Sequence, residues 1–188
     1  MSKDAAATRL LLVQAARRRF AFDGYKATTV RDIAADAGVN VALINRYFVS
    51  KEGLFRACLD RVARDLGQGE ARAPGIERAL EDLVVHVVRA PSDEDSLQLM
   101  LLLRSSGDDA ADAIRRETLR RYAQRLATAV GDEVTDDLLI RAEIALAVVL
   151  GMTMFRTSTR VEPLTSAEPD AVAGPLRDAL RALLAPSR

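Results

Sequence analysis

Apolar side chains recur every three to four positions along almost the whole chain, and a strand-like alternation persists nowhere. In the first such segment, Leu12, Val13, Ala16 and Phe20 form one apolar stripe that ends shortly before Gly24. Glycine, proline and helix-capping residues separate the segments from one another. The pattern predicts an all-helical protein. About nine helices are expected, over residues 5–22, 29–37, 40–47, 51–66, 76–90, 94–105, 109–130, 136–159 and 170–185.

Residues 33–39, followed by a short helix, have the anatomy of a helix-turn-helix. Ala34 is small, as needed where two helices cross closely, and Gly38 can take the positive φ that a tight turn requires. Asn40 can cap the second helix, and Ile44 would pack that helix back on the first. The remaining polar positions would then face outward, toward the major groove of DNA. An ordinary helical corner fits the same pattern, so the spacing alone leaves both interpretations open.

Charge is distributed unevenly between the two ends of the chain. The sequence as a whole has a formal net charge of +0, yet residues 1–51 hold nine basic and four acidic side chains. That head therefore carries +5 and the body, residues 52–188, carries −5. A basic head on an acidic body favours a polyanionic partner for the head alone.

Composition indicates a soluble protein of the cytoplasm. Of the 188 residues, 49% are hydrophobic and 29% are charged, which is typical of a globular fold. Cys58, the only cysteine, lies among apolar neighbours and is expected to be a buried structural thiol in a reducing compartment. No leading signal segment is expected, because the first residues already carry charge. The longest apolar run, 144–155, is shorter than the roughly 20 residues of a membrane span and predicts a buried core helix.

The stretch AARRRFAFDGYKATTVRDIAADAGVNVALINRYFVSKEGLF, residues 15–55, resembles the N-terminal DNA-binding domain of the TetR family of transcriptional regulators. The motif positions are Gly24-Tyr25, Thr28-Thr29, Ala37-Gly38-Val39, Tyr47-Phe48 and Ser50-Lys51-Glu52. The resemblance implies a three-helix DNA-binding domain over residues 1–51, with its helix-turn-helix at about 29–48. It also implies a helical ligand-binding and dimerisation domain over residues 52–188.

Roles in DNA binding follow from the resemblance together with side-chain chemistry. Thr28 or Thr29, Tyr47 and Lys51 are expected to contact phosphate, helped by nearby helix N-termini. The residues expected to face the groove are Arg31, Asn40, Val41, Ala42, Asn45 and Arg46.

Three positions of the second helix depart from the family pattern. The family usually has a small hydroxyl residue where this chain has Asn40, and a glycine where it has Ala42. It often has tyrosine at the position of Asn45. An asparagine there can donate to phosphate or bind adenine bidentately, and the sequence leaves both possibilities open.

The body matches the family at no particular motif, so its roles are hypotheses. Adaptable and polar side chains that could line an effector pocket are His86, Met100, Leu103, Arg104, Met152 and Phe155. Gly151 would allow a neighbouring helix to approach closely. Apolar stripes on the last two helices predict a four-helix interface between the subunits of a homodimer. Its expected members are Leu146, Leu150, Leu176, Leu180 and Leu183.

The leading functional hypothesis is a homodimeric repressor that binds a palindromic operator and is released by a small lipophilic effector. A second hypothesis keeps DNA binding but gives the body only dimerisation or partner docking, without a small ligand. A helical-bundle enzyme is disfavoured, because one histidine and one cysteine provide no metal-ligand set and no Gly-rich phosphate loop occurs. No cofactor or metal is expected, and no membrane association.

Overall fold

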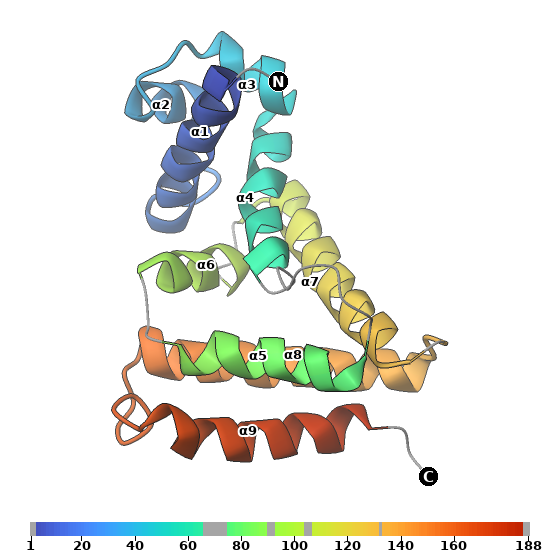
Figure 1. Cartoon of the computed structure of the whole chain (residues 1–188). Coiled ribbons are helices and arrows are strands. Elements are labelled where there is room, and N and C mark those ends of the chain that lie inside the picture. The colour runs from blue at the N-terminus through green and yellow to red at the C-terminus, as the bar shows by residue number, and fades with distance from the viewer. Residues whose placement is uncertain (1–2, 66–74, 90–92, 104–106, 132, 186–188) are drawn as a thin grey trace. The chain divides into compact units, whose positions relative to one another are not determined.

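The computed structural model describes residues 3–65, 75–89, 93–103, 107–131 and 133–185, and all regular elements in these ranges are α-helices (Figure 1). This confirms the all-helical class and the expected number of about nine helices. The helices are α1 (Lys3–Phe22), α2 (Val30–Asp36), α3 (Ala42–Phe48), α4 (Lys51–Asp65), α5 (Ile76–Val88), α6 (Asp93–Leu103), α7 (Asp109–Val130), α8 (Asp136–Thr157) and α9 (Pro169–Leu184).

Helix ends agree with the sequence periodicity to within about two residues. The predicted ends at 66, 90 and 105 lie outside the described residues. Contacts divide the chain into two compact units. The first comprises residues 1–62 and 97–118, and the second comprises residues 63–96 and 119–188. The division into a head and a body at residue 51 remains a prediction.

Three aromatic rings form the centre of the first unit. The ring centroid of Phe20 lies 5.4 Å from that of Tyr25 and 5.2 Å from that of Phe55, and the Tyr25 and Phe55 centroids are 5.0 Å apart. Such stacked and edge-to-face contacts add to the burial of the rings. Cys58 lies buried on α4 in the same unit, as predicted, and burial raises the pKa of its thiol to about 12.

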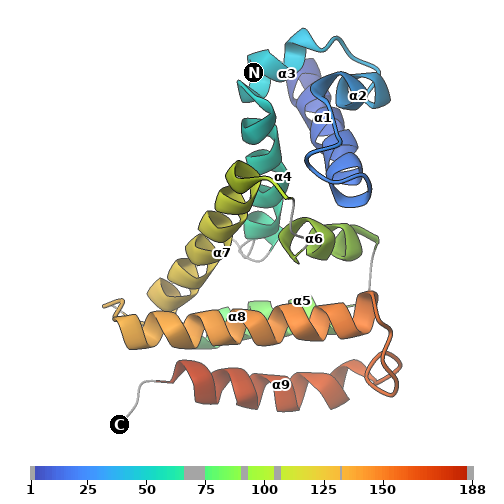
Figure 2. The ribbon, with the colours of Figure 1, turned by 180° about the vertical axis from the view of Figure 1, so that it is seen from behind.

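The second unit is built on α5, α8 and α9, which lie side by side in both views (Figures 1 and 2). Leucine, valine and alanine side chains from the three helices form one buried cluster. Ion pairs join the outer faces of α5 and α9, since Arg177 and Arg181 of α9 donate to Glu81 and Glu77 at 2.9 and 2.7 Å. The buried cluster joins all three helices, and the two ion pairs add a polar contact between α5 and α9.

This core takes up part of the predicted subunit interface, because Leu176 and Leu180 belong to it and Leu183 packs against it. Leu146, Leu176 and Leu180 are buried within the single chain, and Leu150 and Leu183 are half-buried. The sequence pattern correctly marks an apolar stripe, but α5 covers much of it inside the same chain. Leu150 and Leu183 keep part of their surface open to a second subunit, and the interface itself stays a prediction.

Within this chain helix α8 is buried on one face, whereas the apolar run 144–155 predicts a buried core helix. Ala142, Ala145 and Val149 are buried, whereas Ile140 and Ile144 are 56% and 45% exposed. A Cβ built on Gly151 would meet no atom within 4 Å, so no neighbouring helix of the described chain approaches closely there. By length and composition alone α8 could cross a membrane, but a helix that packs one face into a soluble core meets the same criteria.

Candidate nucleic-acid interface

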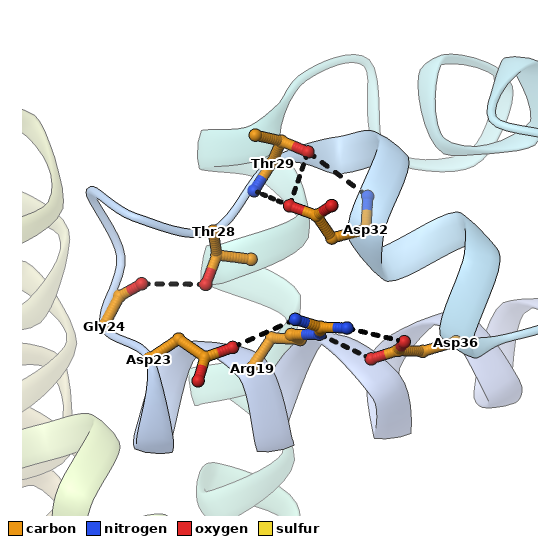
Figure 3. Close-up of polar contacts among 7 residues, drawn as sticks. All are labelled: Arg19, Asp23, Gly24, Thr28, Thr29, Asp32 and Asp36. Atoms are coloured by element: carbon orange, nitrogen blue, oxygen red, sulfur yellow. Dashed lines mark hydrogen bonds and ion pairs between the residues drawn. The ribbon is translucent and has the colours of Figure 1, made fainter.

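Helix α2 begins at a complete capping box on Thr29 (Figure 3). The Asp32 backbone N–H donates to the Thr29 hydroxyl at 3.2 Å, and the Asp32 carboxylate accepts from the Thr29 backbone N–H at 3.0 Å. The Thr29 hydroxyl also donates to the Asp32 carboxylate at 2.7 Å, and this bond, followed by the one from the Thr29 backbone N–H, lowers the pKa of Asp32. Thr28 is only 2% exposed, and its hydroxyl donates to the Gly24 carbonyl at 2.8 Å. Of the two threonines, only Thr29 is exposed, and its hydroxyl already donates to the Asp32 carboxylate.

The turn after α2 is a Schellman motif centred on Gly38. The Gly38 N–H donates to Ala35 O and the Val39 N–H to Ala34 O, both at 3.0 Å. Gly38 has a φ of +66°, the conformation that the sequence predicts for it. These two bonds end α2 and turn the chain directly into α3.

Helix α3 buries one side and offers the other to solvent. Ile44 and Phe48 are buried, whereas Ala42, Asn45 and Arg46 are exposed. The Asn40 side-chain oxygen accepts from the Ala42 N–H at 2.8 Å, so Asn40 supports the helix start as predicted. Val41, the N-cap residue of α3, and Arg31 on α2 are also predicted to contact the groove, and both are exposed. Tyr47 is half-buried.

A strained turn joins α3 to α4. The Ser50 N–H donates to Phe48 O at 2.8 Å, which makes Val49 the centre of a γ-turn with φ +69° and ψ −41°. Val49 is 83% exposed. A Cβ on Gly53 would lie 2.0 Å from Phe48 O, so only glycine fits there. The strained conformation of Val49 lets α4 begin close to the end of α3.

Lys51 stands at the first position of α4 and is half-buried. Its Nζ lies 4.2 Å from the centroid of the Tyr25 ring, and the Tyr25 hydroxyl donates to Glu52 Oε1 at 3.0 Å. Desolvation lowers the pKa of Lys51, and the charges of Asp108 and Glu52 oppose that shift. The Tyr25 ring therefore holds the Lys51 ammonium beside the start of α4.

Arg19 joins α1 to α2, a contact that sequence reasoning missed. Its Nε and Nη2 donate to the two carboxylate oxygens of Asp36 at 2.6 and 2.8 Å, and its Nη1 donates to Asp23 at 3.2 Å (Figure 3). The guanidinium lowers the pKa of Asp36. Arg9 of α1 was missed as well, and its guanidinium lies 5.0 Å from the Phe48 ring centroid. Of these contacts, only the Arg19–Asp23 pair could be expected from the sequence, because its partners are four residues apart.

The predicted pocket residues do not gather in one described cavity. Met152 lines an open apolar groove of about 540 Å³ between α8, residues 163–167 and α9. Phe155 is exposed on α8, and His86 is half-buried on α5. Met100 and Leu103 are exposed on α6, in the first unit. Arg104 lies outside the described residues.

Two family models match the chain. Residues 12–58 match the model described as bacterial regulatory proteins, tetR family. Residues 77–184 match the model described as tetracyclin repressor-like, C-terminal domain. The first match contains the whole of α2 and α3, and the second contains most of α5 and all of α7, α8 and α9.

Curated relatives are similar mainly in the N-terminal part. A transcriptional repressor of Mycobacterium tuberculosis is 44% identical over 73 residues, which is 37% of this chain and 39% of the relative. The regulator BetI of Brucella anthropi is 31% identical over 121 residues, or 61% of each protein. The chain thus aligns with about two fifths of the length of the mycobacterial relative.

Solved structures share the fold over almost the full length. A TetR-family regulator from Streptomyces coelicolor has a TM-score of 0.62 and 27% identity, covering 99% of this chain and 98% of the other. NalD of Pseudomonas aeruginosa, the secondary repressor of a multidrug efflux pump, has a TM-score of 0.62 and 16% identity, covering 94% and 96%. At that identity the second likeness concerns the fold alone.

Proposed function

The chain belongs to the TetR family of bacterial regulatory proteins, and from that premise we propose that it is a cytoplasmic homodimeric repressor that binds a palindromic operator and is released by a small-molecule effector. One observation carries the DNA-binding part of the proposal. Helix α3 is held by Ile44 and Phe48 while Ala42, Asn45 and Arg46 face outward. A helix anchored on one side and exposed on the other fits the major groove.

Each exposed residue of this interface has a proposed role. Asn45, Arg46 and Arg31 read base edges or contact phosphate in the groove, and Val41 and Ala42 touch thymine methyl groups. Thr29, Tyr47 and Lys51 contact the phosphate backbone. Thr28 is left out of this set because it is only 2% exposed. The Asn40 amide nitrogen can still donate to DNA, because only its oxygen is used by the Ala42 N–H.

Dimerisation is proposed through the outer face of α8. Ile140, Ile144 and Phe155 are 56%, 45% and 43% exposed and recur along one side of this helix. Val148 and Met152, which line the apolar groove, follow Ile144 at intervals of four. The exposed stripe and the groove are therefore neighbouring parts of one apolar surface. The same surface on a second copy would cover it, as a two-fold interface requires.

Repression and effector release rest on similarity. The mycobacterial relative and NalD are both described as repressors. Residues 77–184 match a domain named after the tetracycline repressor, which supports a small lipophilic effector for this chain. A body that only dimerises explains the α8 surface equally well, so a thermal-shift screen against lipophilic metabolites and antibiotics separates these two alternatives. The relatives and structural neighbours are regulators, which leaves the enzyme alternative without support.

Selection of bound fragments from a library of bacterial genomic DNA tests the proposal. We expect the purified protein to enrich a two-fold symmetric sequence. Lys51→Ala should weaken binding to every sequence and make the slope of log K against log salt shallower by about one unit. Failure to enrich any sequence would overturn the proposed function, whereas an unchanged salt slope would remove only the phosphate role of Lys51.

A further inference from the structure

We infer that Arg115 is a positioning residue through which α6 and α7 control the DNA-binding head, acting by way of Phe55. This inference rests on the proposed function, since it concerns regulation of the same DNA site. Every residue that carries it belongs to the first compact unit, which contains residues 1–62 and 97–118. The inference depends on the buried guanidinium of Arg115, on the ring of Phe55 that it contacts and on the ring of Tyr25 beside it.

Arg115 makes three contacts from α7 although it is only 7% exposed. Its Nε donates to the Leu101 carbonyl of α6 at 2.6 Å, and its Nη1 pairs with the carboxylate of Asp112. Its guanidinium carbon lies 5.0 Å from the ring centroid of Phe55 on α4. One planar group thus joins α6, α7 and α4.

From Phe55 the contacts continue to the predicted phosphate contact. The Phe55 ring packs against Tyr25 with a centroid distance of 5.0 Å, and the Lys51 ammonium lies 4.2 Å from the centroid of the Tyr25 ring. The Tyr25 hydroxyl also donates to Glu52, the residue after Lys51. Phe55 and Tyr25 therefore connect two cations, Arg115, which contacts α6, and Lys51, the proposed phosphate contact.

The chemistry of these contacts makes them sensitive to small movements. Burial of Arg115 lowers its pKa, and the pairing with Asp112 opposes that shift, so the cation is costly to keep without its partners. A guanidinium is rigid and planar, so its bond to Leu101 O fixes the direction in which it faces Phe55. A shift of α6 must either break that bond or move the cation across the ring. Lysine has no planar group that could make both contacts at once.

A purely structural anchor would show the same contacts, so the test must measure coupling. Coupling between two sites is reciprocal, and DNA bound at the head must then affect α6. We propose to measure hydrogen–deuterium exchange of the amides in residues 97–103 with and without the selected operator duplex. Wild-type protein, Arg115→Met and the matched control Arg116→Met, an exposed arginine next along α7, are compared at saturating duplex.

We expect duplex to slow exchange in α6 by at least about fivefold in the wild type and in Arg116→Met, and to have little effect in Arg115→Met. If Arg115→Met does not fold, Arg115→Lys replaces it, because lysine keeps the charge but loses the planar double contact. Equal protection of α6 in the Arg115 and Arg116 variants overturns the inference. So does a wild type that binds duplex without protecting α6. A wild type that binds no duplex overturns the proposed function itself.

Discussion

Asn45 occupies an exposed position on α3, one residue after the buried Ile44 and before Arg46. Its amide carries a donor and an acceptor, so it is the side chain on this helix best suited to recognise adenine bidentately. The family often has tyrosine at this position. Whether Asn45 contacts a base or a phosphate is therefore the question that a substitution at this position can answer.

Asn45→Ala should weaken operator binding about tenfold, in line with the loss of one direct contact. Fluorescence anisotropy on the selected duplex and on single-base variants measures the effect. Relaxed preference at one adenine would identify a base contact, and a shallower salt slope would identify a phosphate contact. Binding that is unchanged on every duplex would contradict both assignments.

Val49 stores backbone strain at the end of α3. A β-branched residue at φ +69° costs roughly 1–2 kcal/mol compared with a residue that tolerates this region. Val49→Asn should therefore raise the free energy of unfolding by about 1 kcal/mol, measured by urea denaturation. Val134→Asn, at another exposed valine outside the helices, is the control and should have little effect. A loss of stability in Val49→Asn would show that the turn is not strained.

At the scale of elements, Arg19 ties α1 to α2 through Asp36. The guanidinium keeps the pKa of Asp36 below its ordinary value of 3.8. A carboxyl group with a lowered pKa in the folded state stabilises the fold at neutral pH, and this contribution disappears as the pH falls through the lowered pKa. The contribution is therefore present above about pH 4 and is lost in stronger acid.

Asp36→Asn should make the protein less stable at pH 7, and the difference from the wild type should shrink as the pH falls below about 4. Urea denaturation across this range measures both proteins. Glu117→Gln, which removes an exposed acid from α7, controls for the change in net charge. A difference that stays constant with pH would show that the ion pair contributes nothing to stability.

The elements themselves were largely predictable, because their signals are local. The place of Gly38 between two apolar segments predicts a positive φ, and the φ of Gly38 is +66°. The Arg19–Asp36 pair was not predictable, because its partners are 17 residues apart and only the packing of α1 on α2 brings them together. Periodicity likewise found the stripe of Leu176 and Leu180, but could not tell that α5 of the same chain would cover it.

At the scale of the whole molecule, the proposed dimer interface on the outer face of α8 can be tested by its effect on the oligomeric state. Ile144→Glu places a charge at the middle of the proposed interface, and we expect it to convert the dimer to a monomer and to weaken operator binding at least about tenfold. Light scattering coupled to size exclusion measures the mass. Val85→Glu, at a 50% exposed valine on α5, is the matched control and should remain dimeric. A dimeric Ile144→Glu would exclude this face.

The most direct test of the whole account is a hydroxyl-radical footprint of the wild-type protein on its selected duplex. A dimer with two α3 helices in successive major grooves should protect two patches related by a dyad, with centres about 34–36 Å apart along the DNA. Ile144→Glu should lose this symmetric pattern. A single unsymmetric patch in the wild type, or no protection at all, would contradict the account.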